Sequence, residues 1–141
     1  MRSAKMKFEL VKEDKTIWLT ALGSWSNLTV EDYIKQLRDM ALTFAGSPWA
    51  MVLDGVQWQA CPADVFTKLQ DNSSWCFQHQ LKLGVIMLPE HPLFRWQFTK
   101  ATDVPKPDDY QRAIVTCKEE ARAILTRAGF LNADKTQALG S

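Results

Sequence analysis

Cys61 is the residue of this chain whose type and position best suit covalent chemistry. It precedes Pro62, which favours the first position of a helix, and the free backbone amides of a helix N-terminus stabilise a thiolate. A reactive or redox-sensitive thiol is therefore one interpretation. The other is a small apolar residue that seals a loop, and this interpretation is favoured because free cysteine is among the most buried residue types.

The two histidines, His79 and His91, could supply a catalytic base or metal ligands. Neither has a cysteine or carboxylate at ligand spacing, apart from Glu90 beside His91, and two histidines alone do not close a tetrahedral zinc shell. No feature of the sequence brings either histidine to Cys61 as a nucleophilic pair. No string typical of nucleotide binding occurs. We therefore expect neither a metal nor a cofactor, and we predict no catalytic residues.

Asp54 and several aromatic residues could instead bind a ligand or a partner. Asp54 ends a predicted central strand, and open α/β sheets bind ligands at the carboxyl ends of their strands. The favoured alternative is that its carboxylate accepts hydrogen bonds from loop amides. Trp58, Phe94 and Trp96 could line an apolar pocket or a partner-binding patch. The alternative for these rings is that they fill the core of a small domain.

Composition and charge limit the class of protein. A chain of 141 residues that is 46% hydrophobic is enough for one folded domain and excludes a chain disordered throughout. A net charge of +1 offers no basic footprint for nucleic acid or for an anionic membrane. No apolar run approaches the roughly 20 residues of a membrane span, and no signal core follows the basic N-terminus. We therefore expect a cytoplasmic protein with no nucleic-acid partner and no membrane span.

Several segments of the chain have the residue patterns of β-strands. Alternating and β-branched residues at 7–12 and 16–21 predict a β-hairpin. Apolar runs at 49–53 and 83–88 are typical of strands that are covered on both faces, and residues 112–116 form a shorter strand pattern. The segments 54–61 and 102–109 are predicted to be loops.

Helix patterns separate these strands. An apolar stripe runs from Val30 to Phe44, with Thr29 as the expected N-cap. A second helix begins at Pro62, and residues 72–74 are expected to weaken it. A short aromatic helix follows near residue 93. The last helix has a capping box of Thr116 and Glu119, and it ends with Gly129 as C-cap and Phe130 folding back.

This alternation predicts an α/β fold with right-handed crossovers between parallel strands. The initial hairpin makes the sheet mixed, so we expect one domain over residues 1–130 with four to five mostly parallel strands and helices packed on them. Residues 131–141 show no periodicity and are expected to form a flexible tail.

The order and spacing of these elements resemble the SpoIIAA-like family, bacterial proteins related to the anti-sigma-factor antagonist (STAS) fold. The segments that carry the resemblance are the opening hairpin, Thr-Val-Glu-Asp-Tyr at 29–33, Trp-Ala-Met-Val-Leu-Asp at 49–54, Leu-Lys-Leu-Gly-Val-Ile at 81–86, and Val-Thr-Cys-Lys-Glu-Glu-Ala at 115–121 with Leu125 and Gly129-Phe130. The resemblance covers roughly residues 7–130.

The resemblance implies a role in binding rather than catalysis. In the antagonist branch of the family, an Asp-Ser pair after the third strand accepts phosphate on the serine and thereby controls partner binding. Ala60 and Cys61 stand at that place here, so the acid and the hydroxyl are both missing, and we expect no such phosphorylation switch.

We therefore expect a non-catalytic binding module. The leading hypothesis is interaction with a protein partner, or self-association as a homodimer, through an aromatic surface beside the loop after the third strand. The alternative is a carrier or sensor of a small apolar ligand such as a fatty acyl chain, which rests on analogy between the STAS fold and lipid-binding domains. A Cys61-dependent enzyme is the third hypothesis.

Overall fold

The computed structural model describes residues 7–132, which contain five strands and four helices. The strands are β1 (Phe8–Glu13), β2 (Thr16–Gly23), β3 (Trp49–Trp58), β4 (Leu81–Met87) and β5 (Gln111–Ile114). The helices are α1 (Asn27–Leu42), α2 (Ala63–Gln78), α3 (Pro92–Ala101) and α4 (Lys118–Arg127).

The strands form one mixed sheet in the order β1-β2-β3-β4-β5. β1 pairs with β2 in antiparallel orientation, and each following pair is parallel. A helix lies between the two strands of each parallel pair, because the chain must return to the opposite end of the sheet before a parallel strand can begin. The prediction of a single α/β domain with a mixed, mostly parallel sheet is confirmed.

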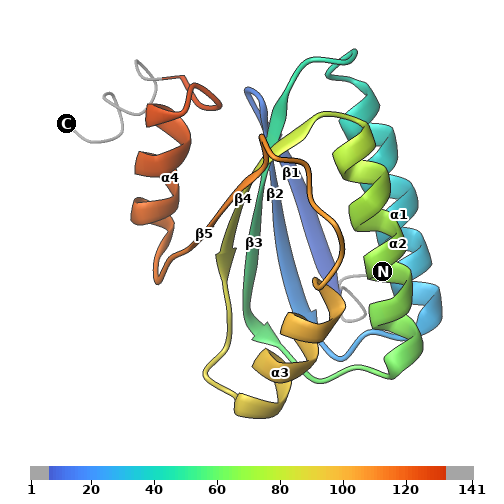
Figure 1. Ribbon diagram of the computed structural model, residues 1–141. Coiled ribbons are helices and arrows are strands. Elements are labelled where there is room, and N and C mark those ends of the chain that lie inside the picture. Colours follow the sequence, from blue (N-terminus) through green and yellow to red (C-terminus); the bar gives the residue numbers. More distant parts are fainter. Residues whose placement is uncertain (1–6, 133–141) are drawn as a thin grey trace.

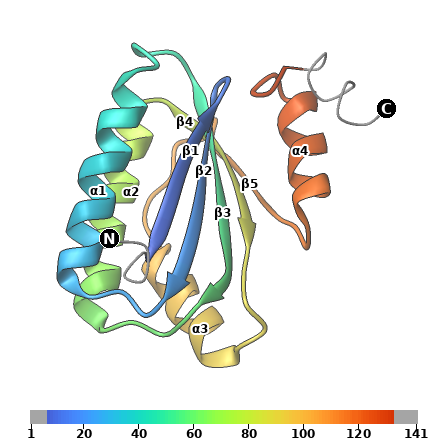
Figure 2. The same cartoon turned by 180° about the vertical axis from the view of Figure 1, so that it is seen from behind.

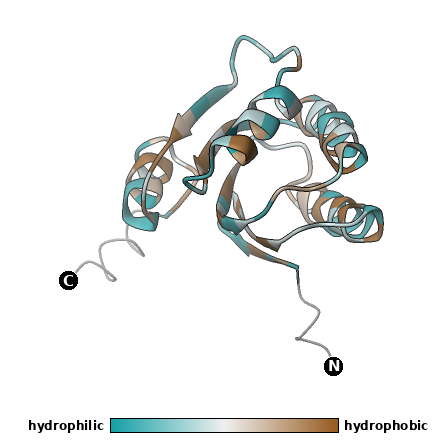
Figure 3. Ribbon diagram, turned by 90° about the horizontal axis from the view of Figure 1, so that it is seen from below, coloured by the Kyte–Doolittle hydropathy of each residue, from teal (hydrophilic) through white to brown (hydrophobic). Residues whose placement is uncertain are grey.

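Helices cover both faces of this sheet (Figures 1 and 2). On one face, α1, α2 and α3 enclose a core that is rich in aromatic rings, among them Trp25, Trp49 and Phe94. On the other face, α4 packs Leu125 against Val52 and Val85 of the central strands. Seen from below, the sheet runs between these two helical layers (Figure 3). The near-continuous apolar sequences of β3 and β4 follow from this double coverage.

Strand β3 is longer than predicted. The expected strand ended at residue 53 and a loop began at Asp54, whereas pairing with β2 continues to Trp58. Thr20 pairs with Asp54 but Leu22 pairs with Gln57, so β3 accommodates one extra residue as a bulge. Gly55 suggested a turn, but a Cβ there would lie 3.1 Å from the carbonyl oxygen of Met87 on the neighbouring strand. The glycine therefore permits close strand packing rather than a chain reversal.

The helix boundaries also correct two predictions. Ser26, not Thr29, is the N-cap of α1, and its Oγ accepts a hydrogen bond from the Thr29 amide at 3.2 Å. Helix α2 is continuous through residues 72–74. Its polar side chains find acceptors or donors nearby: Asn72 Oδ1 accepts from Arg38 of α1 at 3.0 Å, and Ser73 donates to a carbonyl one turn earlier. The Asn72 oxygen and the Ser73 hydroxyl therefore have partners that leave the helix uninterrupted.

The N-cap of α4 is Cys117 rather than the predicted Thr116, and the carboxylate that bonds at this helix start also differs from the predicted one. Glu120, rather than Glu119, accepts hydrogen bonds from the amide of Thr116 at 2.9 Å and from its hydroxyl at 2.6 Å. The reason is the helix start, because α4 begins at Lys118 and Glu120 therefore occupies its third position. These bonds lower the pKa of Glu120 below its ordinary value.

The end of α4 is joined to the turn between β1 and β2. Ala128 is the C-cap of α4 rather than the predicted Gly129, which follows it with a φ of +90°, and the Phe130 amide donates to the carbonyl of Leu125 at 2.9 Å. The Phe130 carbonyl in turn accepts from Lys15 N at 3.1 Å and from Thr16 Oγ1 at 3.0 Å. Leu131, which was expected in the tail, is buried. Residues 133–141 of that expected tail lie outside the described part of the chain.

Candidate functional site

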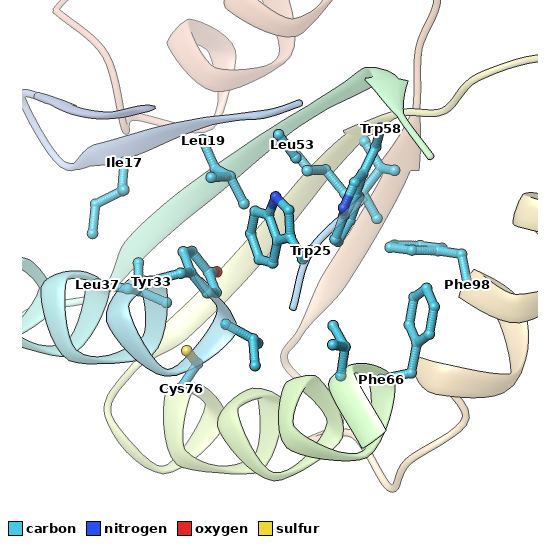
Figure 4. Close-up of a cluster of buried hydrophobic side chains, with 14 of the residues drawn as sticks. Ile17, Leu19, Trp25, Tyr33, Leu37, Leu53, Trp58, Phe66, Cys76 and Phe98 are labelled. Carbon is cyan, nitrogen blue, oxygen red and sulfur yellow. The ribbon is translucent and has the colours of Figure 1, made fainter. Parts of the chain in front are cut away.

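An apolar cavity of about 130 Å³ lies between the sheet and the helices α2 and α3. Leu19 and Leu53 of the sheet face Phe66 and Cys76 of α2, while Trp58 and Phe98 converge at the end nearest α3 (Figure 4). The loop from α3 to β5 completes the lining with Thr102, Val104, Lys106 and Tyr110, and Arg112 follows at the start of β5.

Asn72 of α2 is a polar residue in this apolar lining, with only 3% of its surface exposed. Its Oδ1 accepts the hydrogen bond from Arg38 Nε. A guanidinium only donates hydrogen bonds, so this contact fixes the orientation of the amide group. The amide Nδ2 is left as a donor, and within residues 7–132 no acceptor is bonded to it. A second lining residue, Trp58, has a buried Nε1 donor that has no hydrogen-bond partner within residues 7–132.

Tyr110 closes the cavity on the β4 side. Its ring meets Phe77 edge to face with 4.8 Å between centroids, and its hydroxyl lies directly over Gly84 of β4. A Cβ at Gly84 would overlap that hydroxyl, so the glycine is what lets the phenol approach the sheet. Burial raises the pKa of Tyr110, and the nearby Arg112 partly lowers it. The hydroxyl is therefore protonated at neutral pH and is available as a donor.

Two cationic side chains hold the loop from α3 to β5 (residues 102–110), called the outer loop below. Lys106 Nζ donates to the backbone carbonyls of Thr102 at 2.7 Å and Val104 at 3.0 Å, which folds the loop around the ammonium group. The Arg112 guanidinium donates to Thr102 Oγ1 at 3.2 Å and lies over the Phe98 ring at 5.5 Å from its centroid. Both side chains are exposed and line the cavity, so they lie at its mouth.

The structure does not place the three predicted aromatic residues on one surface. Trp58 is 4% exposed and its ring contacts that of Phe94, which is 1% exposed, at 5.2 Å between centroids. Trp96 is 59% exposed and has Lys100 over its ring at 5.3 Å. The unpredicted extension of β3 directs Trp58 into the core, and the helical period directs Phe94 inward and Trp96 outward. Of the three, Trp58 lines the cavity.

Cys61 is buried, with 6% of its surface exposed. Its Sγ accepts from the Trp25 amide at 3.3 Å and donates to the Gln59 carbonyl at 3.2 Å. Burial raises the pKa of this thiol, and the hydrogen bond from the Trp25 amide only partly offsets that rise. A protonated, hydrogen-bonded thiol is a poor nucleophile, so the environment of Cys61 is that of a residue which seals the loop.

The two histidines have structural contacts of their own. His79 Nδ1 donates to the Trp75 carbonyl at 2.8 Å, and its ring stacks on that of Trp75 at 3.9 Å between centroids. His91 is the N-cap of α3 and accepts from the Phe94 amide at 3.3 Å. Both rings therefore bond to backbone groups at a helix end, His79 at the end of α2 and His91 at the start of α3.

Asp54 lies on the opposite face of the sheet from the cavity. Its Oδ1 accepts from the Val56 amide at 3.3 Å inside the β3 bulge, and its Oδ2 lies 3.9 Å from Lys118 Nζ of α4. It lines an open groove between the sheet and α4, in which Arg122 also pairs with Glu13 at 2.7 Å. The carboxylate therefore joins the bulge to α4 and does not contribute to the cavity.

Sequence reasoning missed most of the polar residues around the cavity, namely Asn72, Lys106, Tyr110 and Arg112. One signal was present for Asn72, because Val65, Leu69, Asn72 and Cys76 follow the helical spacing of a buried stripe. A polar residue on such a stripe needs a partner or a ligand. The loop residues carried no comparable signal, since their placement depends on how residues 102–110 fold back over the sheet.

Comparisons with known proteins do not assign this chain to a family. No protein-family model and no curated protein matches the chain. Within residues 7–132, no three histidine, cysteine or carboxylate side chains are placed to share a metal ion. None of the helices in that same range combines the length and the apolar character needed to cross a membrane.

Proposed function

We propose that this domain is a non-catalytic binding module and that the cavity between the sheet, α2 and α3 binds a small apolar ligand. The observation that carries the proposal is the cavity itself, about 130 Å³ in volume and lined largely by aliphatic and aromatic side chains. An engineered cavity of about 150 Å³ with similar walls stays dry and takes up benzene. The resemblance to SpoIIAA-like proteins, which implies binding rather than catalysis, agrees with this proposal.

The volume also selects among the apolar ligands. Pockets for drug-sized molecules begin at about 300 Å³, more than twice the volume of this one. A fatty acyl chain is therefore disfavoured, and a single aromatic ring or a short branched chain is the expected apolar body. The absence of catalysis is supported by Cys61, because burial raises its pKa and removes the best candidate nucleophile.

Benzene uptake followed by methyl NMR tests this proposal. Benzene is expected to shift the methyl signals of the cavity residues Leu19, Leu53 and Ile86. Val104→Trp, which enlarges a side chain of the outer loop that lines the cavity, is expected to abolish these shifts. Val56→Trp is the matched control, since Val56 is 53% exposed and does not line the cavity. Shifts confined to other methyl groups, or shifts that persist in Val104→Trp, would contradict the proposal.

Association of two copies through the outer face of α3 is the second candidate. Leu93 and Trp96 lie three residues apart on that face and are 52% and 59% exposed. Aromatic side chains supply much of the energy of protein interfaces. Light scattering of the wild type and of Trp96→Ala tests this candidate, which requires a dimer that the substitution dissociates. A monomeric wild type would exclude it.

A further inference from the structure

The mouth of the cavity carries positive charge without a matching negative charge. Arg112 and Lys106 line it, whereas none of the lining residues described between 7 and 132 is an aspartate or a glutamate. The ion pairs of this part of the chain join other groups. Asp109 is the acidic residue nearest in sequence to Arg112, and it pairs with Lys82 at 2.7 Å, which lowers its pKa.

The remaining polar groups of the lining include hydrogen-bond donors. The amide Nδ2 of Asn72 is free to donate because Arg38 occupies Oδ1. The Tyr110 hydroxyl, whose pKa is raised by burial, can donate or accept. The hydroxyls of Ser73 and Thr102 donate to backbone carbonyls, and Thr102 Oγ1 also accepts from Arg112. A ligand that fits both parts of the site therefore has an apolar body and an electron-rich, anionic group.

The charged group of the ligand is expected at the exposed mouth of the cavity rather than in its buried interior. An anion buried among the aliphatic side chains would lose its hydration without full compensation. At the mouth, the exposed Arg112 guanidinium offers a planar pair of donors, which matches a carboxylate, and water still reaches the group. The apolar body then occupies the cavity, where it displaces no charged group.

Resting on the proposed function, we propose that the ligand is a small monocarboxylic acid, bound as its anion with a ring or branched chain inside the cavity and its carboxylate on Arg112. Lys106 adds a second positive charge at the mouth, and two of its donors are already committed to the loop carbonyls. Arg112 is therefore the main determinant of specificity for the anion, and Lys106 contributes through its charge.

Phenylacetate and its neutral counterpart phenylacetamide test this assignment by calorimetric titration. The wild type is expected to bind phenylacetate about tenfold more tightly than the amide, the lower end of what a hydrogen bond to a charged group contributes. Arg112→Gln is expected to remove that preference, so that the acid and the amide bind with similar affinity. Arg127→Gln is the matched control, because it makes the same change of charge on an exposed residue of α4 outside the cavity. Raising the salt concentration should weaken binding of phenylacetate alone.

The outcomes separate this inference from the proposed function. If benzene shifts the cavity methyl groups but the acid binds no better than the amide, the assignment of a carboxylate is wrong and the cavity remains the site. A preference for phenyl phosphate over phenylacetate would overturn it as well. If neither benzene nor any of the acids binds, the proposed function itself fails. Should Arg112→Gln not fold, Lys106→Gln must still weaken phenylacetate binding relative to the amide, and an unchanged ratio would refute the inference.

Discussion

Gly84→Ala is expected to destabilise the protein through Tyr110, and this prediction tests how the cavity is closed. The added Cβ would overlap the Tyr110 hydroxyl and lie 3.2 Å from the Cζ atom of the same ring. The neighbouring strands hold Gly84 in register on both sides, so the phenol must move instead. The movement would disturb the contact with Phe77, whose ring the phenol meets edge to face with 4.8 Å between centroids.

The magnitude follows from two opposing contributions. Overpacking of a well-packed region costs about 1–3 kcal/mol, and losing an aromatic pair contributes about 0.5–1.5 kcal/mol to that cost. Replacing glycine by alanine within a strand recovers roughly 0.5–1 kcal/mol. The net expectation is that Gly84→Ala lowers the free energy of unfolding by about 1–2 kcal/mol.

A double-mutant cycle in urea separates this mechanism from a general effect on β4. In a Tyr110→Ala background the obstacle is gone, so Gly84→Ala should be neutral or stabilising, and the coupling between the two sites should reach about 2 kcal/mol. The urea concentration at the unfolding midpoint should change, while the slope of the free energy of unfolding against urea concentration stays constant. An equal cost of Gly84→Ala in both backgrounds would refute the reasoning, because the phenol would then not be the group that the methyl displaces.

Three further predictions concern the thiols, the α4 ion pair and the α4 cap. Cys61 should react with iodoacetamide far more slowly than the half-buried Cys117, since burial raises the pKa of Cys61; equal rates would contradict this. Arg122→Ala should lower the free energy of unfolding by about 1–2 kcal/mol, because its two-pronged bond to Glu13 is half-buried; urea unfolding measures the loss, and no change would argue against it. The pKa of Glu120 is depressed in the fold, so its contribution is present above the ordinary value of 4.5 and is lost as pH falls through the lower folded pKa. Glu120→Gln should therefore make the free energy of unfolding fall less steeply than in the wild type as pH is lowered below 4.5. Wild-type and variant curves that run parallel would exclude the contribution.

The separation of the two faces of the sheet bears on how the domain could bind a ligand. The cavity lies on the face covered by α1, α2 and α3, whereas Asp54 and the Glu13–Arg122 pair lie on the α4 face. The α4 face is stabilised by ion pairs and by the hydrogen bonds that the Phe130 carbonyl accepts from Lys15 and Thr16.

The amino-acid sequence by itself determined the class of fold. Strand and helix periods depend on local alternation of apolar and polar residues, so the order of elements and the continuous apolar strand at 49–53 were readable directly. The glycine that follows the last helix, Gly129, was also readable, because a positive φ at a helix end selects glycine for local steric reasons. By the same physics, the buried stripe of α2 contained Asn72, although its role was not evident.

Tertiary structure alone decided which of these residues meet. Gly55 has the sequence signature of a turn, and only pairing with β2 extends β3 and directs Trp58 into the core. Phe94 and Trp96 are chemically similar, yet the packing of α3 on the sheet buries one ring and exposes the other. The cavity depends on Asn72, Gly84 and Arg112, which come from a helix and two strands. No local pattern encodes that meeting, because it arises from contacts between segments distant in sequence.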